Sequence, residues 1–202
     1  MNDNKRELFV IGISGSVGSG KSLAVEWFKK QGFITVSSDI VGHDLLLKEK
    51  VKERVVEVFG KEILLDGQID RKKLGDIVFD DPEKLKILNS ILHPLIIAQI
   101  QDLINSSSTE VIVFEVPLLF ETGIEGMFDL IINISASHEV RLQRLVERDK
   151  LSAAEIEQRF RSQFSDETKR ELADITVENN CRKECLFNQL EVLGQFLFGR
   201  DE

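Results

Sequence analysis

The stretch Gly15-Ser-Val-Gly-Ser-Gly-Lys-Ser22 decides the fold of this 202-residue chain. It follows a short apolar run from Leu8 to Ile13 and precedes a segment, Ser22 to Lys30, whose apolar residues recur at helical spacing. Glycines, lysine and serine at these positions are typical of a phosphate-binding loop that connects a buried strand to a helix. The glycines let backbone amides turn inward, and the positive end of the helix reinforces the nest that they form. We therefore predict a site for a nucleoside triphosphate here.

The loop also predicts how that ligand is held. Lys21 supplies a positive charge for the outer phosphates, and the Ser22 hydroxyl suits Mg²⁺, a hard cation that prefers oxygen ligands. The backbone amides of the loop cradle the remaining phosphate oxygens. The residues assigned to the triphosphate are Gly15, Ser16, Val17, Gly18, Ser19, Gly20, Lys21 and Ser22.

Short apolar runs alternate with helical segments along much of the chain. Buried strands are expected at residues 8–13, 33–37, 111–114, 130–134 and 175–177. This alternation predicts an α/β fold with a doubly wound parallel sheet, whose ligands lie at the carboxyl ends of the strands. From residue 40 to about 104 the apolar spacing is helical almost throughout and no segment alternates convincingly, so we expect a helical insertion between two strands.

Three further helices are expected in the second half of the chain. Ser137 is the expected N-cap of a helix that runs to Arg148. Ser152-Ala-Ala-Glu155 matches a capping box and predicts a helix toward Gln163. Residues 182–198 are expected to form the closing helix.

The charge of the chain is acidic overall but uneven. Its 26 basic and 35 acidic residues give a net charge of −9, which argues against nucleic acid or an anionic membrane as a partner. Residues 141–170 hold eight basic and six acidic residues, including six of the eleven arginines, so this window carries +2 and the remainder −11. We predict an arginine-rich lid that closes over a transferred phosphoryl group. For any single arginine the alternative is a surface ion pair, such as Glu155 with Arg159.

The phosphate loop alone leaves three classes of protein open: small-molecule kinases, GTPases, and motor or nucleic-acid ATPases. A GTPase would carry a guanine-reading Asn-Lys-x-Asp motif, but the only Asn-Lys pair, Asn4-Lys5, precedes the first strand. A nucleic-acid ATPase would be expected to have a basic groove with aromatic residues, whereas this acidic chain has one tryptophan and no tyrosine. The arginine window favours the small-molecule kinases.

Two carboxylates end predicted strands and are candidates for the chemistry. Asp39 ends the second strand, where it would accept the proton of an attacking hydroxyl or cap the following helix. Glu115 ends the third strand, where it would contact magnesium through water or cap a loop.

The two cysteines, Cys181 and Cys185, are too few for a disulfide framework or a four-ligand zinc site. Their spacing suits one face of a helix, so we expect ordinary packing residues. The early apolar run is too short for a membrane span or a secretory signal and leads directly into glycines. These features predict a cytoplasmic protein without a membrane partner.

Over almost its whole length the chain resembles the dephospho-CoA kinase family. The phosphate loop is the generic part of this resemblance, and a series of short motifs in fixed order is the specific part. These motifs are Ser38-Asp39 with His43, Gly67-Gln-Ile-Asp70-Arg71 with Leu74, Leu92-His93-Pro94, Pro117-Leu-Leu-Phe-Glu121, Gln143-Arg144 with Arg148-Asp149, Arg161-Ser-Gln163, Ala173-Asp174 and Asn179-Asn180.

The resemblance implies a three-layer P-loop NTPase fold similar to that of nucleoside monophosphate kinases, with a parallel sheet, a helical substrate domain and a lid. It implies a core of residues 1–39, 107–144 and 173–202. The helical domain for the CoA acceptor would span residues 40–106, and the lid residues 145–172.

The activity that the resemblance implies is transfer of the ATP γ-phosphoryl group to the ribose 3′-hydroxyl of dephospho-CoA, with Mg²⁺, to give CoA and ADP. Asp39 and Lys21 are then the catalytic residues. Arg144 and Arg148 belong to the nucleotide or lid side, and Asn179 or Asn180 to the adenine. The acceptor side comprises Asp39, His43, Arg71, His93, Pro117 and Leu118.

Two positions depart from the family pattern. Ser37 stands where the family usually has the first aspartate of Asp-x-Asp, and Asn89 stands where an acid is common. The partner expected is dephospho-CoA, for a monomer or small homo-oligomer. The alternatives are another P-loop kinase of nucleosides or nucleotides, and a regulator that binds ATP without catalysis.

Overall fold

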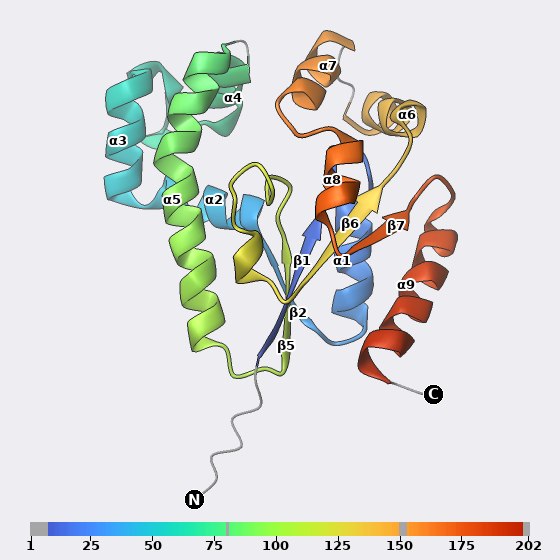
Figure 1. Ribbon diagram of the computed structural model, residues 1–202. Coiled ribbons are helices and arrows are strands. Elements are labelled where there is room, and N and C mark those ends of the chain that lie inside the picture. The colour runs from blue at the N-terminus through green and yellow to red at the C-terminus, as the bar shows by residue number, and fades with distance from the viewer. Residues whose placement is uncertain (1–7, 80, 150–152, 200–202) are drawn as a thin grey trace, which may run out of the picture. The chain divides into compact units, whose positions relative to one another are not determined.

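The computed structural model describes residues 8–79, 81–149 and 153–199. The chain forms two compact units, shown in Figure 1. We call residues 1–36 with 107–202 the sheet unit, and residues 37–106 the inserted unit.

The sheet unit is built on parallel strands. Over the described residues it has one five-stranded sheet, in the order β2-β5-β1-β6-β7. The strands are β1 (Phe9–Ser14), β2 (Ile34–Ser37), β5 (Val111–Glu115), β6 (Leu130–Ser135) and β7 (Ile175–Glu178). The central strand β1 pairs in parallel with β5 and β6, and β6 pairs in parallel with β7. Parallel strands are buried on both faces, which explains their unbroken apolar runs. The predicted parallel α/β fold is confirmed.

Helices flank the strands of this unit (Figure 1). They are α1 (Lys21–Lys30), α6 (His138–Asp149), α7 (Ala153–Arg161), α8 (Asp166–Leu172) and α9 (Lys183–Phe198), with a 3₁₀ turn η2 (Glu125–Met127). The N-cap prediction for α6 is confirmed, because the Ser137 hydroxyl accepts a hydrogen bond from the Val140 amide at 3.3 Å. The capping-box serine expected before α7, Ser152, lies outside the described residues.

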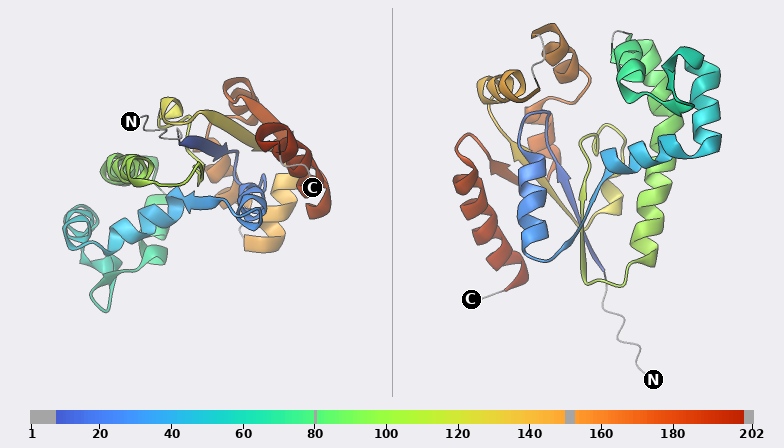
Figure 2. Two further views of the ribbon diagram at one scale, coloured as in Figure 1. Left: turned by 90° about the horizontal axis from the view of Figure 1, so that it is seen from below. Right: turned by 180° about the vertical axis from the view of Figure 1, so that it is seen from behind.

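Helices α1 and α9 pack side by side on one face of the sheet (Figure 2). Trp27 and Phe28 of α1 and Leu190 of α9 are buried in one apolar cluster with strand residues such as Ile13. Gly194 allows the close approach, because a Cβ there would lie 2.6 Å from the Trp27 ring. The core thus holds the phosphate loop between a rigid strand and a rigid helix.

The inserted unit is mainly helical. Its elements are α2 (Ser38–Leu47), α3 (Glu49–Phe59), the 3₁₀ turn η1 (Lys61–Ile63), β3 (Leu64–Leu65), β4 (Gln68–Ile69), α4 (Arg71–Phe79) and α5 (Pro82–Ser106). Its apolar core includes Val55 and Ile63, both fully buried, and Leu74 of α4.

The expectation of an insertion without strands is wrong at one place. Strands β3 and β4 form an antiparallel hairpin in which Leu65 pairs with Gln68. The connecting residues Asp66 and Gly67 both have positive φ, at 50° and 78°, as a two-residue hairpin turn requires. Strands of two residues are too short to show alternation, so only the Asp-Gly turn signals them.

Helix α5 is the one helix of the described chain that is long and apolar enough to cross a membrane. Its most apolar window has a mean hydropathy of 1.4, and Pro94 lies inside it. Within the inserted unit α5 packs against α2 and α4. Length and composition alone do not make such a helix a membrane span.

Candidate active site

The phosphate loop lies between β1 and α1, at the carboxyl end of the central strand. Gly20 precedes the first helical residue with φ at 100°, and Gly15 has φ at 145°. A Cβ at Gly15 would collide with the Ile134 carbonyl oxygen, and one at Gly20 with the Asn179 amide. These two glycines are therefore needed for backbone conformation and for close approach together.

Lys21 and Ser22 begin α1 and point into different surroundings. The Lys21 ammonium folds back over the loop and donates to the carbonyls of Gly15 at 2.9 Å and Ser16 at 3.1 Å. The Ser22 hydroxyl donates to the Glu115 carboxylate at 2.9 Å. The structure thus joins Ser22 and Glu115, which the sequence analysis had assigned separately to a magnesium site.

The donor chemistry around the loop suits a magnesium nucleotide. Hydroxyl and carboxylate oxygens are the hard ligands that Mg²⁺ prefers. The hydroxyls of Ser16 and Ser19 are buried and have no hydrogen-bond partner among the residues that the structure describes. A buried hydroxyl without a partner is costly, and a phosphate oxygen would satisfy it. The residues around the phosphate loop therefore fit a nucleoside triphosphate with Mg²⁺.

Arg144 and Asn179 support the loop from the side of α6 and β7. The Arg144 guanidinium donates to the carbonyls of Gly18 and Ser19, both at 3.3 Å, and to that of Asn179 at 2.9 Å. The Asn179 side chain is fully buried and donates to the Ser19 carbonyl at 2.7 Å. Asn180 lies next to it and accepts from the Ser137 amide at 2.7 Å. Arg144 and Asn179 thus bind the backbone of the phosphate loop, and Asn180 binds the Ser137 amide instead.

A cavity of about 260 Å³ lies beside the phosphate loop, between Ser16 and the segment from α7 to α8. Its lining combines the cations Arg141 and Arg161 and the carboxylates Glu157 and Asp166 with polar and aromatic side chains. Gln163 reaches from this segment to the loop itself, where its carbonyl oxygen accepts from the Val17 amide at 2.8 Å. Sequence analysis named Gln163 only as part of a motif and missed this contact.

The arginines of the window 141–170 differ in their burial and in their partners. Arg141 is buried, lies 4.7 Å from the Phe160 ring and donates to the Ala136 carbonyl, and burial lowers its pKa. Arg170 pairs with Asp166 and Glu178, which raise its pKa. Arg161 is exposed at the cavity. The side chain of Arg148 lies outside the described residues.

A buried ion pair anchors the segment between α7 and α8. Lys169 is fully buried and pairs with Glu121 at 2.9 Å. It also donates to the Pro117 carbonyl at 2.8 Å, while Glu121 accepts from the Phe164 amide at 2.7 Å. Burial lowers the pKa of Lys169, and the Glu121 carboxylate opposes that shift. Both ends of the segment Pro117 to Glu121 thus bind Lys169, to which no pattern in the sequence pointed.

The predicted acceptor residues Asp39, His43, Arg71 and His93 lie in the inserted unit. Asp39 is exposed in the first turn of α2, whose N-cap is Ser37, so the alternative that Asp39 caps the helix is wrong. Burial lowers the pKa of His43, the Arg71 guanidinium lowers it further, and the Asp39 carboxylate opposes both. Burial also lowers the pKa of His93, on α5. Both imidazoles are therefore biased toward the neutral form.

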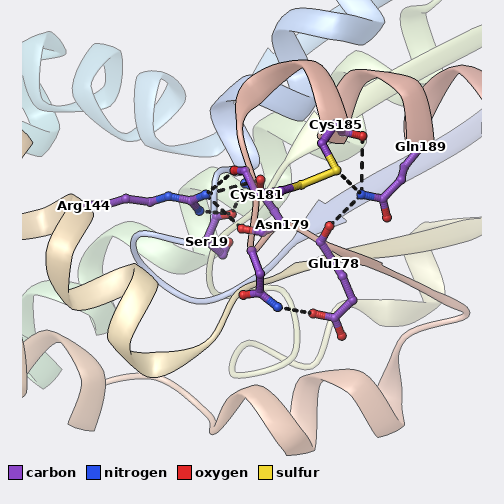
Figure 3. Close-up of a disulfide and its surroundings, with 8 residues drawn as sticks. Ser19, Arg144, Glu178, Asn179, Cys181, Cys185 and Gln189 are labelled. Carbon is purple, nitrogen blue, oxygen red and sulfur yellow. Dashed lines mark hydrogen bonds between the residues drawn. A yellow bond between two sulfur atoms is a disulfide. The ribbon is translucent and has the colours of Figure 1, made fainter.

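The prediction that Cys181 and Cys185 are ordinary packing residues is wrong. They are exposed and form a disulfide that joins the loop after β7 to the start of α9 (Figure 3). The expectation failed because α9 begins at Lys183, so Cys181 lies in the loop and not on a helix face.

Comparison with known proteins agrees with this geometry. The family model described as dephospho-CoA kinase matches residues 9–184. A dephospho-CoA kinase of Fusobacterium nucleatum is 40% identical over 185 residues, which cover 91% of this chain and 96% of the relative.

Two solved structures that match nearly the whole chain are similar as well. The crystal structure of TT1252 from Thermus thermophilus has a TM-score of 0.79 and 31% identity, and covers 96% of this chain and 100% of its own. A dephospho-CoA kinase from Campylobacter jejuni has a TM-score of 0.68 and 30% identity, and covers 95% and 98%. The match over residues 9–184, together with the phosphate loop, places this chain in the dephospho-CoA kinase family.

Proposed function

We propose that this protein transfers the γ-phosphoryl group of ATP to the ribose 3′-hydroxyl of dephospho-CoA, giving CoA and ADP. The observation that carries the proposal is the family match over residues 9–184. It is supported by a complete phosphate loop whose buried Ser16 and Ser19 hydroxyls have no partner among the described residues, and by a cavity beside the loop that Arg141 and Arg161 help to line. Among P-loop small-molecule kinases this family is favoured over kinases of nucleosides or nucleotides, and over a non-catalytic ATP binder.

The triphosphate is held by the loop. The backbone amides of residues 15–22 and the helix N-terminus neutralise its charge, and Lys21 leaves the Gly15 and Ser16 carbonyls to contact the outer phosphates. Arg144 and Asn179 act by holding the loop backbone in place. Arg141 lines the cavity from α6 and Arg161 from the lid segment, and we assign Arg148 to the nucleotide or lid side by the family motif.

Magnesium is part of the proposal. Ser22 would ligate the ion and Glu115 would orient a ligand water, since their oxygens are 2.9 Å apart. The ion would neutralise charge on the β- and γ-phosphates. Its removal with a chelator is expected to abolish turnover.

The acceptor is handled by the inserted unit. Asp39 accepts the proton of the attacking ribose hydroxyl, as a solvent-exposed carboxylate with no role in helix capping is free to do. His43, Arg71 and His93 hold the acceptor, Arg71 by its positive charge on the pyrophosphate. Pro117 and Leu118, which follow β5 in the sheet unit, complete the acceptor assignment.

The test is acceptor-dependent ADP release by purified protein with ATP and magnesium. Dephospho-CoA should give ADP and CoA in equal amounts, and nucleosides or nucleoside monophosphates should give neither. Lys21→Ala is the catalytic control, and Lys29→Ala, at the exposed end of the same helix, is its matched surface control. ADP release that ignores dephospho-CoA would refute the proposal.

The division into core, acceptor domain and lid belongs to this proposal, as do the cytoplasmic location and the monomeric or small oligomeric state. Limited proteolysis with and without each substrate tests the division. Protection of residues 145–172 by ATP, and of residues 40–106 by dephospho-CoA, is the expected pattern.

A further inference from the structure

The disulfide between Cys181 and Cys185 serves no step of the proposed phosphoryl transfer, yet it adjoins the phosphate loop. Both cysteines are exposed and accessible to small molecules. The bond closes a five-residue ring that fastens the loop after β7 to the first turn of α9. Its position raises the question of what changes when it opens.

Short contacts connect this ring to the phosphate loop (Figure 3). The Cys181 carbonyl accepts a hydrogen bond from the Arg144 guanidinium at 3.3 Å. The same guanidinium donates to the Ser19 carbonyl, and Asn179, two residues before Cys181, donates to Ser19 as well. The disulfide therefore restrains the segment that holds Arg144 and the phosphate loop together.

The two sulfurs differ in their surroundings. Cys185 is the third residue of the 16-residue helix α9, where the positive helix end favours a negative charge. The Gln189 side-chain amide lies 3.8 Å from the Cys185 sulfur and 2.9 Å from the Glu178 carbonyl. Cys181 precedes the helix and lacks both effects. Cys185 is thus the better leaving group in an exchange reaction.

We propose that Cys181 and Cys185 are a site of thiol–disulfide exchange with low-molecular-weight thiols, and that the disulfide state strengthens ATP binding. A thiolate attacks the Cys181 sulfur, the bond between the two protein sulfurs breaks, and Cys185 leaves as a thiolate that takes up a proton. A second thiolate attacks the small-molecule sulfur of the mixed disulfide, so that Cys181 leaves as a thiolate, takes up a proton, and the oxidised small-molecule disulfide is released. Two electrons pass from two small thiols to the protein disulfide.

The reaction of the enzyme itself supplies such a thiol. Dephospho-CoA and CoA both end in one, and this single point rests on the proposed function. Glutathione or any other small thiol would serve equally in the exchange.

The direction of the effect follows from conformational freedom. While the ring is closed, the backbone that leads into it, from Glu178 to Cys181, is already ordered where it meets Arg144 and Ser19. When the ring opens, this segment gains freedom that ATP binding must remove again, at a cost in free energy. We therefore expect reduction to weaken ATP binding by about threefold or more.

The experiment measures ATP binding by calorimetry, with magnesium and without dephospho-CoA, on oxidised protein and on protein reduced with a phosphine. Cys181→Ser and Cys185→Ser, alone and together, are the matched variants, because each keeps the backbone carbonyls and removes the bond. The oxidised wild type should bind ATP more tightly than its reduced form. The variants should bind like the reduced form under both conditions.

Mass spectrometry after alkylation gives the second readout. Oxidised protein exposed briefly to glutathione, or separately to coenzyme A, should carry the mixed disulfide on Cys181 and the alkyl group on Cys185. Equal ATP affinity in both redox states, or free alkylation of both cysteines after oxidation, would overturn the proposal. Neither measurement needs turnover, so a failed kinase assay leaves them unaffected.

Discussion

Asp39 is the residue on which the proposed chemistry depends most directly. Replacing Asp39 by asparagine should leave ATP affinity unchanged, because Asp39 is not among the residues assigned to the triphosphate. Turnover should fall by about 100-fold or more, the scale of removing a general base. Asp44→Asn, an equally exposed change on the same helix, is the control and should have little effect. Steady-state kinetics that show equal turnover for both variants would remove Asp39 from the mechanism.

The buried pair of Lys169 and Glu121 supports a prediction about stability. Replacing Lys169 by methionine leaves the largely buried Glu121 carboxylate without its cation, which should cost about 3–5 kcal/mol of unfolding free energy. Urea denaturation measures this. Glu121→Gln combined with Lys169→Met should be less destabilising than the sum of the single changes, and strict additivity would show that the two side chains do not interact.

At the residue scale, sequence reasoning succeeded where chemistry is local. Lys21, Ser22 and the glycines are recognisable because the loop uses consecutive residues in one conformation. Gln163 and Lys169 were not assigned to any role, since their partners lie at least 48 positions away and neither belongs to a local chemical pattern. The cysteine pair was misjudged because a helix start, two residues after Cys181, decided its geometry.

At the scale of elements, Gln163 joins the end of the α7 segment to the phosphate loop. Gln163→Ala should make the Val17 amide exchange with solvent about 2- to 10-fold faster in the ligand-free protein, the factor expected for losing one hydrogen bond. Hydrogen exchange followed by NMR measures it. Gln158→Ala, within α7 itself, should leave that amide unchanged, and an equal effect of both variants would point to general loosening of α7.

The helices and strands that could be predicted are those with a clear local signal in the sequence. The strands of the sheet were found as unbroken apolar runs, and α6 by its capping serine. The hairpin β3–β4 was not predicted, because its stability comes from the Asp66-Gly67 turn and from Ile63 in the core of the inserted unit. Tertiary burial of this kind leaves no pattern in four strand residues.

At the scale of the whole molecule, two histidines make stability depend on pH. Burial lowers the pKa of His43 and His93 in the folded state below the ordinary value of 6.5. As the pH falls through 6.5, the unfolded chain therefore binds more protons than the folded state does. The free energy of unfolding decreases from there downward. The midpoint of denaturation should therefore decrease as the pH is lowered from about 7 to about 5. Replacing both histidines by glutamine should flatten this dependence, and an unchanged slope would exclude them as its source.

The insertion of residues 37–106 between β2 and β5 has a consequence for synthesis of the protein. The central strand β1 pairs only with β5 and β6 among the strands of the described chain, and Phe9 lies opposite Val111. A ribosome that adds about 5–20 residues per second needs about 5–20 s to make the intervening chain. During that time the inserted unit is synthesised, whereas the central strand β1 waits without the partner strands of the folded sheet. Nascent chains stalled before residue 111 should therefore depend on chaperones far more than those stalled after β6.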